Sequence, residues 1–159
     1  ALVVDVRRVA TAPDLNMAHI VELRAGFVCR RGHPILAQFP DQVPFDALLA
    51  YPMASTPLSQ EVARIMVDHY GPRANPAHMT TLQCEEIPSL IDVVQQTDAI
   101  YLGILGAARQ GLASGSLVEL AMDPPFRAGA LLALITLAGR TELPIMSVFR
   151  EFVTRQLTD

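Results

Sequence analysis

Three adjacent side chains, Cys84, Glu85 and Glu86, form the densest group of chemically competent residues in the chain. A thiolate is a nucleophile, and paired carboxylates can act as general acid and base. Such chemistry also needs a partner base or a metal, and the sequence has no GxSxG, HExxH, P-loop or CxxC pattern, while its four histidines are scattered. A small α/β enzyme that uses Cys84 or Glu85 is one hypothesis. Because no partner base or metal-binding pattern accompanies these residues, we expect no catalytic residue, no metal and no cofactor.

The segments around these residues suggest a ligand-binding position instead. Thr80–Gln83 is short and β-prone, Ile87–Gln96 carries apolar residues at helical spacing, and Ala99–Leu105 is a continuous apolar run. Strand, helix and buried strand are typical of a βαβ unit with a parallel sheet. Ligands of open α/β folds bind at the carboxyl edge of the strands, where the first turn of a helix also offers free N–H groups. The predicted ligand contacts are Cys84, Glu85, Glu86 and Ile87, with Ile104 and Leu105 as further candidates.

A second strand-to-helix junction follows a predicted strand at Tyr51–Ser55. Thr56 and Pro57 fit the first positions of a helix that reaches Tyr70, with Thr56 as the N-cap. Two interpretations remain open, because the same hydroxyl can cap the helix or bind a ligand, and capping one N–H leaves others free. The candidate ligand contacts at this junction are Ser55, Thr56, Pro57 and Leu58.

Two residues have structural interpretations that we prefer to functional ones. Cys84 could be a redox-sensing thiol, but a free cysteine is more often a small buried filler, and Cys29 is too distant in sequence to suggest a redox pair. His33 precedes a proline in an Arg-Gly-His-Pro turn, which favours a structural role over catalysis.

The composition indicates a globular protein without a nucleic-acid-binding face. Half of the 159 residues are hydrophobic and 18% are charged, with a net charge of −4 and no Lys/Arg cluster larger than a pair. The longest apolar run, Ala128–Gly139, falls short of a membrane helix, and no signal peptide is visible. The chain starts in a strand-like run without an initiator Met, so we expect a fragment or a processed chain of a cytoplasmic protein.

The remaining elements complete an α/β pattern. Strands are predicted at Ala1–Val6, Ile20–Arg30, Ser116–Leu120 and Ala128–Ala138, with Gly26 as a bend or bulge. A last helix is predicted to be capped by Thr141, with Pro144 in its first turn. Its apolar side is predicted to carry Met146, Phe149, Phe152, Val153 and Leu157.

Four segments in this order resemble the effector-binding region of LysR-type transcriptional regulators. Gly26–Ile35 is similar to the family's apolar strand and its Arg-x-Gly-His-Pro-Leu turn, and Phe45–Pro52 to its short approach to the next strand. Gln83–Leu105 resembles the polar, helical and "Gly-Ile-x-Leu-Leu-Pro" segment, and the chain from Arg127 onward resembles the closing strand and helix. The match departs from the family pattern at Thr97, Ala99 and Ile104, and Glu85-Glu86 stands where a small polar cap is usual.

The resemblance implies a type 2 periplasmic-binding-protein-like fold with two α/β lobes and an effector in the cleft between them. Residues 26–115 would form one lobe, and residues 1–25 and 116–159 part of the other, with the family's N-terminal winged helix-turn-helix absent from this chain. The implied function is that of a non-enzymatic effector-sensing and oligomerisation domain. It would bind an unidentified small molecule, form a dimer (a tetramer in the full-length protein) and act on DNA only through the missing domain. A stand-alone solute-binding protein of the same fold is the alternative.

Overall fold

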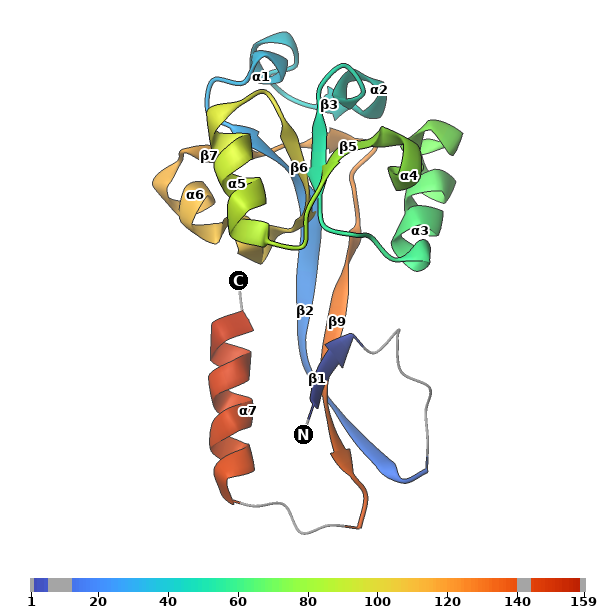
Figure 1. Ribbon diagram of the computed structural model, residues 1–159, viewed down its shortest axis with the longest axis vertical. Helices are drawn as coiled ribbons and strands as arrows, with labels where there is room; N and C mark the ends of the chain where they lie inside the picture. Colours follow the sequence, from blue (N-terminus) through green and yellow to red (C-terminus); the bar gives the residue numbers. More distant parts are fainter. Residues whose placement is uncertain (1, 6–12, 140–143, 158–159) are drawn as a thin grey trace. The chain divides into compact units, whose positions relative to one another are not determined.

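Figure 1 shows the computed structural model, which describes residues 2–5, 13–139 and 144–157. The chain divides into two compact units, one made of Ala1–Arg24 and Gly129–Asp159 and the other of Ala25–Ala128. Strand β2 (Leu15–Arg30) contributes residues to both. Residues 116–128, which were predicted to belong with residues 1–25, fall in the larger unit in this division. The assignment of the two units to two lobes stays a prediction.

The larger unit is built on a mixed sheet whose centre is parallel. Strand β4 (Met53–Ser55) pairs in parallel with β5 (Thr80–Gln83) on one side and with β6 (Ile100–Ile104) on the other. Strand β2 runs antiparallel to β6 and to β7 (Leu117–Glu119). Helix α5 (Ile87–Gln96) connects β5 to β6, so the βαβ unit is confirmed, with β4 between its two strands.

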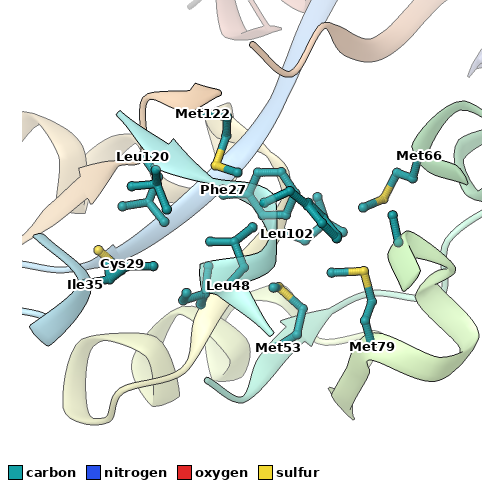
Figure 2. Packing of buried hydrophobic residues seen from close by; sticks show 14 residues of the cluster. Phe27, Cys29, Ile35, Leu48, Met53, Met66, Met79, Leu102, Leu120 and Met122 are labelled. Atoms are coloured by element: carbon teal, nitrogen blue, oxygen red, sulfur yellow. The ribbon is translucent and has the colours of Figure 1, made fainter. Parts of the chain in front are cut away.

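Side chains on the central strands alternate between two separate cores. Phe27, Met53 and Leu102 point into the larger core, and Figure 2 shows them packed with residues such as Leu48, Met66 and Met79. Their neighbours Val28, Ala54 and Tyr101 point into a smaller core under α5. A strand that is buried on both faces must be apolar throughout, which is why residues 99–105 form one continuous apolar run.

The helices of the larger unit cover both faces of this sheet. Figure 1 shows α5 and α6 (Arg109–Ser114) on one side, and α3 (Gln60–Tyr70) and α4 (Pro76–Met79) on the other. Shorter elements complete the unit: α1 (Pro34–Gln38), α2 (Phe45–Leu48), the 3-10 helices η2 (Pro72–Ala74) and η3 (Leu105–Ala108), and a two-stranded parallel sheet of β3 (Val43–Pro44) and β8 (Met122–Asp123).

One local prediction is wrong, and one of the two alternatives predicted at Gly26 is excluded. The N-cap of α3 is Ser59 rather than Thr56, since the Ser59 hydroxyl accepts a hydrogen bond from the Val62 N–H at 3.3 Å. Both residues satisfy the capping preference. Leu58, which lies between them in a non-helical segment, packs against the larger core. At Gly26 there is no bulge, and β2 continues through it in unbroken register with Gly103.

A bulge does occur on β5. Met53 is paired with Thr80 but Ala54 is paired with Leu82, so Thr81 is an extra residue. Its hydroxyl accepts from the Met53 N–H at 2.9 Å and donates to the Met53 carbonyl at 3.1 Å, so it satisfies both groups that a regular ladder would have paired. The bulge places Gln83 on the same face as Ser55, and the next residue, Cys84, on the face that α5 covers.

The smaller unit contains β1 (Leu2–Asp5), all but the first residue of β9 (Ala128–Leu137), the first part of β2, and α7 (Pro144–Leu157). Strand β1 is antiparallel to β9, with Leu2 opposite Ile135. The predicted cap at Thr141 lies outside the described residues. Of the predicted apolar side of α7, Met146 and Val153 are half-buried, whereas Phe149 and Phe152 are exposed together with Ile145 and Val148.

Candidate functional site

The ends of three parallel strands bring the two predicted junctions together at one edge of the larger unit. Ser55 at the end of β4 is paired with Gln83 at the end of β5 and with Leu102 near the end of β6. The Cys84 N–H donates to the Ser55 carbonyl at 3.3 Å, which joins the two junctions directly. The residues that follow β4 and those that follow β5 are thus neighbours, as the parallel sheet predicts.

A pocket opens on the α3 face of this edge. Its volume is about 550 Å³, and among its lining residues are Ser55, Leu58, Ser59, Thr80 and Gln83. The Ser55 side chain is fully buried, with its hydroxyl 3.3 Å from that of Thr80. Of the residues predicted at this junction, Ser55 and Leu58 line the pocket. Half-buried Thr56 and exposed Pro57 do not line it.

The other predicted group lies at the start of α5. Cys84 is half-buried against the smaller core, and its sulfur accepts the Glu86 N–H at 3.3 Å, which supports the structural interpretation of this thiol. The Glu86 carboxylate accepts a hydrogen bond from the Ser89 hydroxyl, whereas exposed Glu85 has no hydrogen bond or ion pair among the described residues. Ile87 is half-buried.

The two candidates after β6 differ in exposure. Ile104 is half-buried, but Leu105 is buried and lies against Gly26, where an added Cβ would be 2.8 Å from its Cδ2. Leu105 therefore packs the core and offers little surface to a ligand. Cys29 faces the larger core rather than the one beside Cys84, and burial raises the pKa of its thiol to about 11.

Tyr101 is a polar residue that the sequence analysis missed. Its side chain is 1% exposed and packs in the smaller core, and desolvation raises the pKa of its phenol. The ring lies over Gly103: a Cβ added to this glycine would be 2.2 Å from the Tyr101 hydroxyl oxygen and 2.4 Å from its Cζ. The hydroxyl therefore points along β6 toward its carboxyl end. A tyrosine inside an apolar run, two residues before a glycine, was the available signal.

His33 is structural, as predicted. The imidazole is 1% exposed, its Nδ1 accepts the Ile35 N–H at 3.1 Å, and its Nε2 lies 3.1 Å from the Asp98 carbonyl. Since Nδ1 accepts, the proton belongs on Nε2, which donates to Asp98. Within residues 2–5, 13–139 and 144–157, no group of three or more His, Cys, Asp or Glu residues could hold a metal, and no helix could cross a membrane.

Polar loops gather at the carboxyl ends of the parallel strands, which is where open α/β folds bind ligands. The LysR substrate binding domain model matches residues 2–158. The chain therefore belongs to this family, the ligand-binding part of LysR-type transcriptional regulators, and the predicted type 2 periplasmic-binding-protein-like fold is confirmed.

Individual relatives agree with this assignment. The chain is 26% identical over 152 residues to the SDS degradation transcriptional activation protein of a Pseudomonas species. These aligned residues cover 95% of this chain but 48% of that protein. The chain thus spans about half the length of this curated relative.

Two solved structures share its fold. HinK, a LysR family regulator from Pseudomonas aeruginosa, has a TM-score of 0.66 at 16% identity, over 94% of this chain and 50% of HinK. The regulatory domain of CcmR from Synechocystis, solved in complex with 2-PG, has a TM-score of 0.65 at 16% identity, over 99% of this chain and 73% of that one.

Proposed function

We propose that this chain is the effector-sensing and oligomerisation domain of a cytoplasmic LysR-type transcriptional regulator and has no enzymatic activity. It binds a small metabolite at the carboxyl edge of the larger unit and thereby controls DNA binding by another part of a longer protein. The convergence of Ser55 and Thr56 with Cys84–Ile87 at one sheet edge carries this proposal. The complex of the CcmR regulatory domain with 2-PG supports it, because that domain has the same fold.

Regulation requires that the ligand prefers one conformation of the domain. A ligand shifts a conformational equilibrium only by its difference in affinity for the two states. Contacts that form in only one of the two states would supply such a difference.

The edge of the sheet at β5 is the proposed oligomerisation surface. Strand β5 lies at the end of the strand order, and Leu82 on it is 37% exposed. An unpaired strand edge with an exposed apolar side chain favours pairing with another chain. Helix α3 and β5 together would form this surface in a dimer, with tetramers in the longer protein.

A thermal-shift screen tests ligand binding. The panel contains aromatic acids, amino acids, sugars, nucleobases and 2-PG, applied to the wild-type chain, to Glu85→Ala and Thr56→Ala, and to Glu151→Ala on exposed α7 as the control. A ligand at 100 times its Kd adds about 2.7 kcal/mol to the unfolding free energy. We expect a hit whose shift falls in the two edge variants but not in the control.

Two results would count against the proposal. A hit with equal shifts in all variants would move the site away from this edge, and a panel without any hit would argue against ligand sensing by this chain. Turnover of a hydrolase or transferase substrate that depends on Cys84 would refute the absence of catalysis.

A further inference from the structure

The Tyr101 phenol is a hydrogen-bonding group that has no partner in the part of the chain that the structure describes. No described residue donates to its hydroxyl or accepts from it. The side chain is 1% exposed. The hydroxyl oxygen is not fully buried, so the small accessible area of this side chain includes it. A hydroxyl that is buried in a core without a hydrogen bond destabilises the fold, unless a water or a ligand pairs with it.

The position of this hydroxyl is fixed by its surroundings. Tyr101 is flanked on its face of the sheet by Val28 on β2 and Ala54 on β4. The ring is directed over Gly103, toward the end of β6 where the candidate ligand contacts gather. Leu90 and Val94 of α5 pack in the same core, and Cys84 packs against it. The hydroxyl thus lies on the α5 side of the carboxyl edge.

The start of α5 offers further donors on that side. The Glu86 N–H donates to the Cys84 sulfur and Pro88 has no N–H. The N–H groups of Ile87 and Ser89 are therefore the donors of the first turn for which no described residue is an acceptor. The phenol is a donor as well, because burial keeps it protonated. A ligand that meets these groups must present an acceptor oxygen.

We infer that Tyr101 is a ligand-contacting residue of the proposed effector site, donating a hydrogen bond to a carbonyl or carboxylate oxygen of the effector. This inference rests on the proposed function. The Glu85 carboxylate beside these donors has no partner among residues 2–5, 13–139 and 144–157, and the Glu86 carboxylate accepts a hydrogen bond from the Ser89 hydroxyl. Their charges disfavour additional negative charge on the ligand. The ligand class is therefore a neutral or zwitterionic molecule with an acceptor oxygen, such as an amide or an amino acid.

The test compares two Tyr→Phe variants. Tyr70 donates its hydroxyl hydrogen bond to the Pro124 carbonyl at 2.9 Å, so Tyr70→Phe breaks a bond within the protein. Tyr101→Phe breaks no hydrogen bond to any residue that the structure describes. We expect Tyr101→Phe to keep or raise the melting temperature and Tyr70→Phe to lower it. A lower melting temperature of Tyr101→Phe would overturn the inference, because it would show that the hydroxyl already has a protein partner.

The ligand arm uses L-phenylalanine, benzamide, benzoate, D-glucose and 2-PG as probes. Binding is followed by melting temperature and by fluorine NMR of the chain labelled with 3-fluorotyrosine, whose three tyrosine signals are assigned with the Phe variants. We expect L-phenylalanine or benzamide to bind more tightly than benzoate and 2-PG and to move the Tyr101 signal. Tyr101→Phe should weaken that affinity roughly 3- to 10-fold, and Tyr70→Phe should leave it unchanged.

The outcomes separate the inference from the proposed function. A probe that binds equally well to Tyr101→Phe, or a preference for the anionic probes, overturns the inference and leaves effector sensing in place. If none of the five probes binds, the inference and the proposed function both fail.

Discussion

Replacing Gly103 with alanine should destabilise the larger unit through one identifiable clash. The added Cβ would stand 2.2 Å from the Tyr101 hydroxyl oxygen, 2.4 Å from Cζ and 3.0 Å from Cε1. A flexible side chain would turn aside, but this ring is enclosed between Val28 and Ala54 under α5 and is 1% exposed. Relief of the clash must therefore come from movement of the packed core.

The expected cost follows from two opposing effects. Overpacking a filled core costs about 1–3 kcal/mol. Replacing glycine with alanine restricts the unfolded chain and returns about 0.4–1 kcal/mol. Gly103→Ala should therefore lower the free energy of unfolding by about 1–2 kcal/mol, measured by urea denaturation and visible as a lower midpoint at an unchanged slope.

A double-mutant cycle with Tyr101→Leu identifies the cause. Leucine keeps an apolar side chain at this position but lacks the Cζ, Cε1 and hydroxyl atoms that meet the new methyl group. In the Tyr101→Leu background, Gly103→Ala should cost nothing or stabilise the chain, which gives a coupling energy of about 1–2 kcal/mol. Equal costs in both backgrounds would refute the placement of the ring over Gly103, and with it the direction of the hydroxyl.

Two further predictions concern residues whose roles the structure defines. Ser59→Ala should lower the free energy of unfolding by about 1 kcal/mol because it removes the α3 cap, and Thr56→Ala by less than about 0.5 kcal/mol; urea titrations that gave the reverse order would restore Thr56 as the cap. Burial raises the pKa of Cys29 from 9.0 to about 11, so the folded chain keeps a proton that the unfolded chain has already lost. The free energy of unfolding should therefore decrease between pH 9 and about 11, with a flatter profile in Cys29→Ala; identical profiles would contradict this.

The sequence predicted those elements whose local signals agree with their tertiary environment. The bounds of β5 and α5 were predicted correctly, because the helical spacing of Leu90 and Val94 is also the spacing that buries them. Gly71 ends α3 with a φ of +88°, a conformation that glycine adopts readily. His33 was assigned a structural role from its turn, and its two hydrogen bonds confirm that role.

The sequence could not settle features that depend on contacts between distant segments. Both Thr56 and Ser59 are residue types that cap helices, and the packing of Leu58 against the larger core, which follows the assembly of distant segments, is not visible in the sequence. The bulge at Thr81 depends on hydrogen bonds to Met53, which lies 28 residues earlier. In the sequence Tyr101 is one more residue of a buried run, because the position of its hydroxyl over Gly103 appears only in the folded structure. The effector-binding residues themselves stay predictions.

The extra residue on β5 lets this strand carry one residue more than β4 without changing which side chains face the pocket. Side chains alternate along a regular strand, so an added residue without a bulge would reverse the face of every residue after it. Deletion of the Thr81 codon would remove the bulge and leave Leu82 opposite Ala54 and Gln83 opposite Ser55, so Gln83 would keep its place in the pocket on the α3 side. The bulge is thus a place in β5 where such a domain can gain or lose a codon without exchanging the amide of its pocket for a thiol.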